Sequence, residues 1–365
     1  MRDARVGPDL DDDFESDDDA LASPRAERTD TLSGNDGAPG FARVVAAEEA
    51  GIRLDRFLAD HQAVATRSQV TRTLEAGRVA VDGRPPEKPG QSLRAGQEVT
   101  VLAAPVRPSG LEPQAMALDF VYVDAHLAVL NKPAGLVVHP GAGHAQGTLV
   151  HGLLHWARES GRALALRDAE RPGIVHRIDK DTSGLMVVAL SEAALTGLQA
   201  MFQAHDLERI YRAVTLGARG EGGTIRTTHA RDPVDRKRFT GRLPAAVAPN
   251  ARRAVTHWQA LSRGEMLVVV ACRLETGRTH QIRMHLAELG TPIIADPLYG
   301  GTLPAHVHGA RGTQALRELQ AARAMPRLAL HAAVLGFRHP VTGDTLRFEA
   351  PDPPDLAALV AAIPG

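Results

Sequence analysis

The hydrophobic pattern changes abruptly between residues 173 and 190. A short apolar run ends at Val175, polar residues dominate 176–183, and a longer apolar run extends from Leu185 to Leu190. A continuous run rich in β-branched residues is typical of a buried strand. The polar segment holds two Arg/Lys cations, one histidine, two carboxylates and two hydroxyls, and Gly184 closes it. The pattern therefore predicts a polar loop held between two buried strands, a frequent position for catalytic groups.

The same criteria divide the rest of the chain after residue 118 into alternating elements. Strands are predicted at 120–123, 127–130, 209–214, 255–261, 266–274, 327–336 and 345–349. Helices are predicted at 148–159, 192–205, 313–323 and 355–362, and a turn from strand into helix at 275–286. The glycine-rich segment 220–223 predicts a hairpin.

Residues 42–104 have the pattern of a separate small domain. Leu54, Phe57 and Leu58 share one face of a predicted helix, and a second helix is predicted at 69–76, where Gly77 ends it. Strands are predicted at 78–83, which runs into an Asp-Gly turn, and at 98–102. The proline-containing segment 105–117 is interpreted as a linker to a large domain at 118–365.

The amino-acid composition predicts an acidic tail and a cellular location. Of the 365 residues, 1–40 carry 12 acidic and 4 basic side chains, so an acidic disordered tail is expected over 1–41. The remaining residues carry 38 basic and 31 acidic side chains, a net charge of +7 that permits a polyanionic partner. The single cysteine, the absence of an 18-residue apolar run and the acidic amino terminus favour a cytoplasmic protein without a membrane partner.

Two groups of side chains suggest chemistry. Asp179 has Arg177 and Lys180 as sequence neighbours, so its carboxylate should be ionised and available as a nucleophile; the alternative is a solvated surface turn. Arg278, His280 and Arg283 fall near the start of a helix, where positive potential suits a phosphate or carboxylate.

Other candidate groups are weaker. His151 and His155 lie four residues apart on a predicted helix, but without a third ligand the pattern favours packing or surface histidines over a metal site. In the small domain a basic face could form; it would comprise Arg53, Arg56, Arg67 and Arg72.

Three ordered motifs resemble the signatures of the RluA-type pseudouridine synthases. Residues 176–185 (HRIDKDTSGL) resemble the central signature, in which leucine usually stands at the position of Ile178. Residues 131–141, beginning Asn-Lys-Pro-Ala-Gly, and 277–283 (GRTHQIR) match two further signatures. Gly51 to Asp55 and Gly77 to Gly83 resemble the S4-type RNA-binding domain. The resemblance covers roughly residues 42–350.

The resemblance implies an α+β fold. The expected catalytic domain has a large mixed, mainly antiparallel sheet flanked by helices and loops, and a small α/β S4-like domain precedes it. It also implies that Asp179 is the catalytic aspartate, Tyr211 the active-site tyrosine and Arg283 the basic partner of the aspartate. His176, Arg177, Arg278, His280 and Lys132 are expected to contact RNA together with the four arginines of the small domain.

The implied activity is isomerisation of uridine to pseudouridine on a flipped-out nucleotide. The expected partner is large-subunit (23S) ribosomal RNA or a pre-50S particle, with no metal, no other cofactor and a monomer as the default state. Transfer RNA is an alternative substrate, and a non-catalytic RNA-binding or ribosome-assembly factor is an alternative function.

Overall fold

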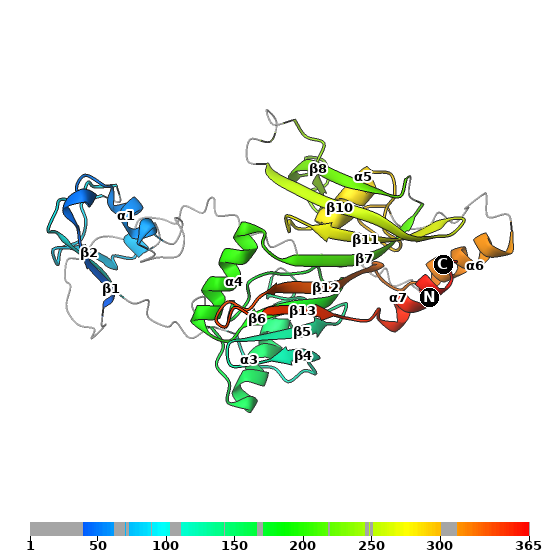
Figure 1. The fold of residues 1–365 in the computed structure, drawn as a ribbon, viewed down its shortest axis with the longest axis horizontal. Coiled ribbons are helices and arrows are strands. Elements are labelled where there is room, and N and C mark those ends of the chain that lie inside the picture. Colours follow the sequence, from blue (N-terminus) through cyan, green and yellow to red (C-terminus); the bar gives the residue numbers. More distant parts are fainter. Residues whose placement is uncertain are drawn as a thin grey trace, which may run out of the picture. The chain divides into compact units, whose positions relative to one another are not determined.

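The protein forms two compact units, 39–102 and 111–364, within the residues that its computed structural model describes. Figure 1 shows the two units with their helices and strands labelled. The described residues are 39–61, 70, 73–88, 90–102, 111–141, 143–165, 171–217, 220–244, 248, 251–300 and 312–364. The predicted acidic tail lies outside them up to residue 38.

The small unit has a three-stranded antiparallel sheet in the order β1-β3-β2. Its elements are β1 (Pro39–Val44), the 3-10 helix η1 (Ala47–Glu49), α1 (Leu54–Asp60), β2 (Val79–Val81) and β3 (Glu98–Leu102). Leu54, Phe57 and Leu58 of α1 are fully buried, as their spacing predicted. Of the predicted second helix, residues 70 and 73–75 are described and helical, and Gly77 follows with φ +65°.

Strand β1 was not predicted, because it overlaps the end of the segment assigned to the acidic tail. It is an edge strand with Ala42, Arg43 and Val44 exposed, so no buried face marks it in the sequence. Its partner β3 lies more than fifty residues further along the chain. The strand therefore depends on a tertiary contact rather than on a local apolar pattern.

The large unit is built on one mixed sheet, which in the described residues contains ten strands. The strands are β4 (Phe120–Val123), β5 (Leu127–Lys132), β6 (Ser183–Ala189), β7 (Glu208–Leu216), β8 (Gly222–Arg231), β9 (Phe239–Thr240), β10 (Arg252–Arg263), β11 (Leu267–Leu274), β12 (Leu330–Arg338) and β13 (Thr345–Glu349). Their order is β4-β5-β6-β12-β7-β11-β10-β8-β9, and β13 pairs with β12. Strands β6 and β12 pair in parallel, and the other described pairs are antiparallel. The predicted fold class is confirmed.

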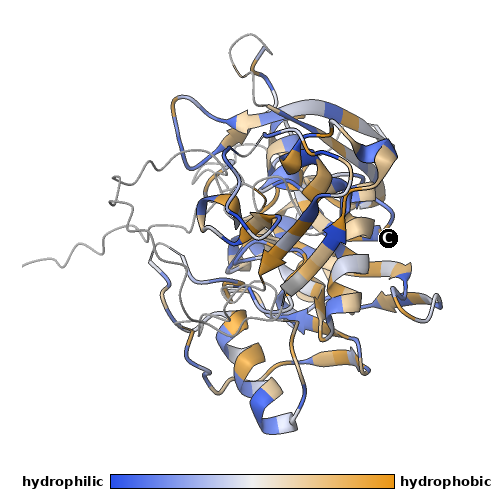
Figure 2. Ribbon diagram, turned by 90° about the vertical axis from the view of Figure 1, so that its left-hand side faces the viewer, coloured by the Kyte–Doolittle hydropathy of each residue, from blue (hydrophilic) through white to orange (hydrophobic). Residues whose placement is uncertain are grey.

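Helices cover both faces of this sheet. They are α3 (Leu149–Ser160), α4 (Glu192–Ala204), α5 (Gln281–Glu288), α6 (Thr313–Ala324) and α7 (Pro354–Ala361). Along β6, Met186 and Val188 join one apolar cluster with α3, whereas Leu185 and Val187 join a second cluster with α4. Figure 2 shows the ribbon coloured by hydropathy, with both hydrophobic and hydrophilic residues on its helices and strands. A strand buried on both faces reads as a continuous apolar run, which is why β6 was predictable.

The predicted hairpin at 220–223 is wrong. Strands β7 and β8 flank this segment in sequence, but β11 and β10 lie between them in the sheet. Strand β7 pairs with the mostly buried β11, whereas β8 has mostly exposed or half-buried residues and pairs with β10 near the sheet edge. Burial of apolar strands in the centre of the sheet thus outweighs the local turn signal.

Candidate active site

The polar loop that precedes β6 is fixed through its backbone. Lys132 at the end of β5 donates a hydrogen bond from Nζ to the Lys180 carbonyl (2.9 Å), and Arg327 donates from Nη1 to the Asp181 carbonyl (3.3 Å). Gly184 ends the loop at φ +119°, and a Cβ there would lie 2.3 Å from the Ala332 backbone oxygen. Glycine is therefore required for β6 to approach β12, and the loop is held on a rigid support.

The predicted contact of Lys132 with RNA is wrong. The residue has no exposed surface, and its Nζ donates to the carbonyls of Pro133 (2.8 Å), Leu136 (2.8 Å) and Lys180. Burial lowers the pKa of Lys132 to about 7, against the opposite effect of the Asp179 and Asp181 carboxylates. Lys132 therefore holds the backbone of the loop in place and does not form part of the RNA-accessible surface.

The side chains of Asp179 and Arg283 meet, although 104 positions separate them. Arg283 donates from Nη1 to Oδ2 of Asp179 at 3.2 Å, and α5 carries it to that point. Its other edge forms a two-pronged pair with Asp296, from Nε to Oδ2 (2.8 Å) and from Nη2 to Oδ1 (3.0 Å). Asp296 is fully buried, so Arg283 is clamped from behind and presents one nitrogen to Asp179.

This pair keeps the Asp179 carboxylate charged. Burial by itself raises the pKa of Asp179, but the neighbouring His280, Arg283 and Arg177 outweigh it and hold that pKa below the usual value. The Asp179 side chain retains 20% of its surface exposed, compared with 10% for Arg283. The site thus holds an ionised, accessible carboxylate beside a nearly buried guanidinium.

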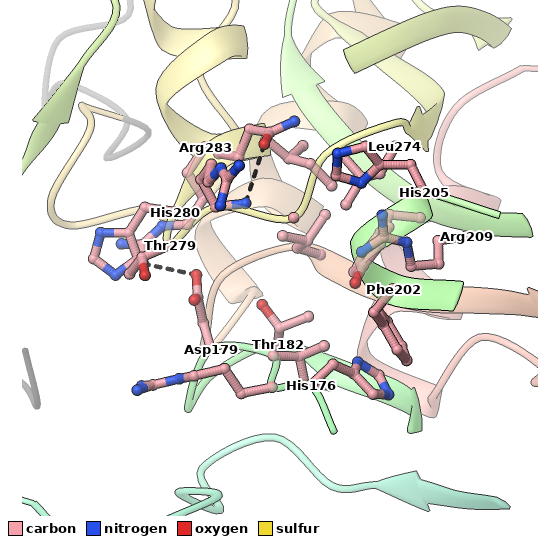
Figure 3. Close-up of a pocket in the computed structure, with 18 of the residues that line it drawn as sticks. His176, Asp179, Thr182, Phe202, His205, Arg209, Leu274, Thr279, His280 and Arg283 are labelled. Carbon is pink, nitrogen blue, oxygen red and sulfur yellow. Dashed lines mark hydrogen bonds and ion pairs between the residues drawn. The ribbon is translucent and has the colours of Figure 1, made fainter. Parts of the chain in front are cut away.

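The Asp179 side chain faces a cavity of about 310 Å³, which residues of the motifs 176–185 and 277–283 help to line (Figure 3). Tyr211 on β7 forms part of its wall, is 8% exposed and belongs to the main apolar cluster. Burial raises the pKa of the Tyr211 hydroxyl, so the phenol stays neutral at physiological pH. The three residues predicted to be catalytic therefore line one cavity, which is large enough for a nucleobase and its ribose.

Four further residues expected to contact RNA also line the cavity. Arg177 is exposed, and Arg278 and His280 are half-buried at the loop before α5. His176 points the other way: its ring stacks on Phe202 (4.6 Å between centroids), and its Nε2 accepts a hydrogen bond from the Val187 N–H (3.1 Å). His176 thus ties the loop to β6, and burial lowers its pKa to about 3.

Two of the four small-unit arginines that were expected to contact RNA have local partners in the structure. Arg53 pairs with Asp55 at 2.7 Å, and Arg56 pairs with Asp60 at 3.3 Å, all four side chains being well exposed. Arg67 and Arg72 lie outside the described residues. Each of the two described arginines therefore has a nearby carboxylate that partly neutralises it.

Sequence reasoning missed Asp296 and Tyr299. The Tyr299 ring lies 5.2 Å beneath the Arg283 guanidinium, and its hydroxyl accepts a hydrogen bond from the Phe239 N–H (2.8 Å). The Asp296 carboxylate also accepts the N–H groups of Leu298 and Tyr299. An acidic residue inside the apolar segment 292–301 was the available signal, since a buried carboxylate needs a partner.

His151, one of the two histidines on α3, has a structural explanation. His151 is 2% exposed and its Nδ1 lies 2.7 Å from the hydroxyl of the N-cap residue Thr148. Within the described residues, no group of three or more possible metal ligands is found. Nor does any helix of that part of the chain have the length and apolarity to cross a membrane.

Comparisons with known proteins match both units. Residues 126–288 match the model of the RNA pseudouridylate synthase family, and residues 52–99 match the S4 domain. "Ribosomal large subunit pseudouridine synthase D" of Xanthomonas campestris pv. campestris is 43% identical over 320 residues, 88% of this chain and 91% of that protein.

The chain belongs to the RNA pseudouridylate synthase family. The protein of the same name from Escherichia coli strain K12 is 38% identical over 87% of this chain and 92% of its own length. The solved structure of Human RNA Pseudouridylate Synthase Domain Containing 4 is 26% identical, covers 67% of this chain and 92% of that chain, and has a TM-score of 0.51. This pseudouridylate synthase is thus an isomerase that acts on RNA and carries an S4 RNA-binding domain.

Proposed function

We propose that this pseudouridylate synthase isomerises specific uridines of large-subunit (23S) ribosomal RNA, with Asp179 as the catalytic carboxylate. The observation that carries the proposal is the cavity in which Asp179, Arg283 and Tyr211 converge. The relatives from X. campestris and E. coli are named for the large ribosomal subunit, which supports this RNA class.

The reaction breaks the N1–C1′ bond of uridine and forms a C1′–C5 bond; C5 loses a proton and N1 gains one, so the change is an isomerisation. Breaking a bond at C1′ builds positive charge on the ribose, and a carboxylate beside it stabilises or traps that charge. Asp179 is ionised and exposed to the cavity, as this role requires. Its attack on C1′, its addition to the base and its assistance of proton loss at the sugar are all compatible with this position.

Arg283 and Tyr211 complete the chemistry. Arg283 keeps Asp179 charged and aimed, because a guanidinium clamped on its other edge cannot rotate away. Tyr211 offers a neutral aromatic ring on which the detached uracil can stack while it turns, an interaction of about 1–3 kcal/mol. The target nucleotide has to leave its RNA stack to reach the cavity, and the exposed Arg177 would occupy the vacated position.

The proposed division of labour follows the two units. Residues 42–104 would capture RNA, 105–117 would link, and 118–365 would catalyse. The half-buried Arg278 and His280 would contact the RNA backbone at the rim of the cavity. The proposed setting is the cytoplasm during ribosome assembly, with a pre-50S particle as partner.

Mapping of pseudouridines by carbodiimide primer extension tests the RNA class. RNA from cells with the gene, without it, and without it but complemented by the gene would be compared. We expect specific stops in large-subunit ribosomal RNA to disappear without the gene and to return on complementation. If stops disappear only from transfer RNA, the substrate is transfer RNA and not ribosomal RNA. If stops are retained in every RNA, the proposal is overturned.

A further inference from the structure

Arg209 is a buried cation in the cavity that the proposed mechanism does not use. It lies on β7 two residues before Tyr211, so both side chains are on the same face of the strand, about 7 Å apart along it. The residue is 6% exposed and lines the cavity between Phe202 and His205 (Figure 3).

The hydrogen-bonding capacity of Arg209 is largely unused. Nη2 donates to the Glu275 carbonyl (3.0 Å), Nε has no partner in the described part of the chain, and no carboxylate there forms an ion pair with the guanidinium. One face is covered by the Phe202 ring, at 5.4 Å from Cζ to the ring centroid. A buried guanidinium with five donors and one carbonyl acceptor is an incomplete site, because buried charges are normally paired.

The surroundings do not supply the missing negative charge. The acidic side chain of Glu275 is already shared by Arg253 (3.0 Å) and His257 (2.7 Å). His205 lies close to further cations, and burial together with Arg209, Arg278 and Arg253 lowers its pKa. This end of the cavity is therefore positive, whereas the carboxylate of Asp179 lies at the other end with its own arginine.

The chain also keeps the guanidinium edge clear. A Cβ at Gly277 would lie 2.6 Å from Nη1 of Arg209, so the loop that leads to α5 passes the guanidinium at a residue without a side chain. The same loop contributes Gly277, Arg278 and Thr279 to the cavity lining.

We infer that Arg209 forms a subsite for one backbone phosphate of the substrate RNA, next to the target uridine. The inference rests on the proposed function for its choice of ligand. A phosphodiester supplies the single negative charge and the acceptor oxygens that a guanidinium binds best. The spacing from Tyr211 corresponds to the reach of one nucleotide between its base and its phosphate. With uracil on Tyr211 and a phosphate on Arg209, the intervening ribose would be drawn toward Asp179.

The test combines a protein variant with a single neutral linkage in the RNA. A stem-loop RNA that the wild-type protein modifies is prepared with a methylphosphonate at one of the two linkages that flank the target uridine. Dissociation constants are measured over a range of salt concentrations for the wild type and for Arg209→Gln. Arg212→Gln is the matched control, because it removes the same charge from the same strand but on the opposite face, where Arg212 pairs with Asp352.

We expect Arg209→Gln to weaken binding about tenfold and to reduce the slope of log K against log salt by about 1. The neutral linkage should weaken wild-type binding by the same factor at one of the two positions and should leave the variant unaffected there. Arg212→Gln should respond to the neutral linkage as the wild type does. An unchanged salt slope in Arg209→Gln, or equal losses for the wild type and Arg209→Gln, would overturn the subsite.

Two further measurements keep the outcome decisive. If Arg209→Gln does not fold, Arg209→Lys takes its place; it retains the positive charge and should keep the salt slope. The wild-type protein alone gives the second measurement. If neither neutral linkage changes its dissociation constant, the subsite is refuted. The RNA is chosen by wild-type activity, so a failure of the ribosomal RNA assignment would appear in the mapping experiment and would leave this comparison intact.

Discussion

Arg53 and Arg56, at the start of helix α1, and Arg283 in the cavity lie in opposite environments. Arg53 and Arg56 are exposed and pair with carboxylates two and four residues away. Arg283 is nearly buried and pairs with Asp179 and Asp296, which come from other segments of the chain. Exposed local pairs contribute at most about 1 kcal/mol, whereas loss of one partner from a buried pair costs about 3–5 kcal/mol. The comparison shows that position in the fold, and not residue type, decides what an arginine does here.

Among the substitutions that test this comparison, the largest effect is expected from Arg283→Met, which leaves the buried Asp296 carboxylate and the partly exposed Asp179 carboxylate without their cation. Pseudouridine formation under single-turnover conditions should fall about 10³-fold, the equivalent of ~4 kcal/mol. Because Arg283 helps to lower the pKa of Asp179, its removal should raise that pKa, and the acid limb of the residual rate should move to higher pH. An acid limb at the wild-type pH would show that Arg283 does not control the ionisation of Asp179.

A smaller loss, about 10²-fold in rate, is expected for Asp296→Asn, because an amide cannot accept both hydrogen bonds from Arg283. The affinity for RNA should stay constant, and the substitution should add little to Arg283→Met, since both act through one guanidinium. Asp232→Asn is the control, because Asp232 accepts two backbone N–H groups of a surface turn. Full additivity of the two site variants would contradict this coupling.

Lys132→Met separates a role in folding from a role in RNA binding. The loss of three hydrogen bonds to backbone carbonyls should lower the free energy of unfolding by about 3 kcal/mol in denaturant titrations. The dissociation constant for RNA should be unchanged when it is measured below the unfolding temperature. Weaker RNA binding by a fully folded Lys132→Met variant would contradict this account and would indicate that Lys132 contacts RNA.

The smallest stability effect is expected from the double variant Arg53→Gln/Arg56→Gln in the small unit. Loss of two exposed ion pairs should change the free energy of unfolding by less than about 1 kcal/mol. If this helix contacts RNA phosphates, the salt slope of binding should nevertheless fall by about 2. An unaltered slope would restrict Arg53 and Arg56 to their local pairs.

What could be predicted from sequence follows the same division between local and distant interactions. The continuous apolar run before Leu190 predicted β6, and the spacing of Leu54, Phe57 and Leu58 predicted α1, because each pattern reports its own burial. Strand β1 and the true partners of β7 and β8 depend on sheet neighbours far along the chain. The hairpin at 220–223 was predicted wrongly for that reason.

The site shows the same limit. The motifs that carry Asp179 and Arg283 are local, the resemblance to the family indicated Tyr211, and the structure brings these three residues into one cavity. No local pattern shows that Asp296 clamps Arg283 or that Arg209 lies buried without a carboxylate. Lys132 belongs to the motif at 131–141, but its contact with the Lys180 carbonyl of the cavity loop could be found only in the folded chain.

The account depends on the carboxylate of Asp179, and one paired assay tests it most directly. RNA binding and single-turnover pseudouridine formation are measured in the same samples of wild type, Asp179→Asn and Asp181→Asn. Asp181→Asn is the control, because it removes the same charge from the same loop. We predict that both variants bind RNA with the wild-type dissociation constant. Asp181→Asn should form pseudouridine, and Asp179→Asn should form none that can be detected. Pseudouridine formation by folded Asp179→Asn at the wild-type rate would contradict the central claim.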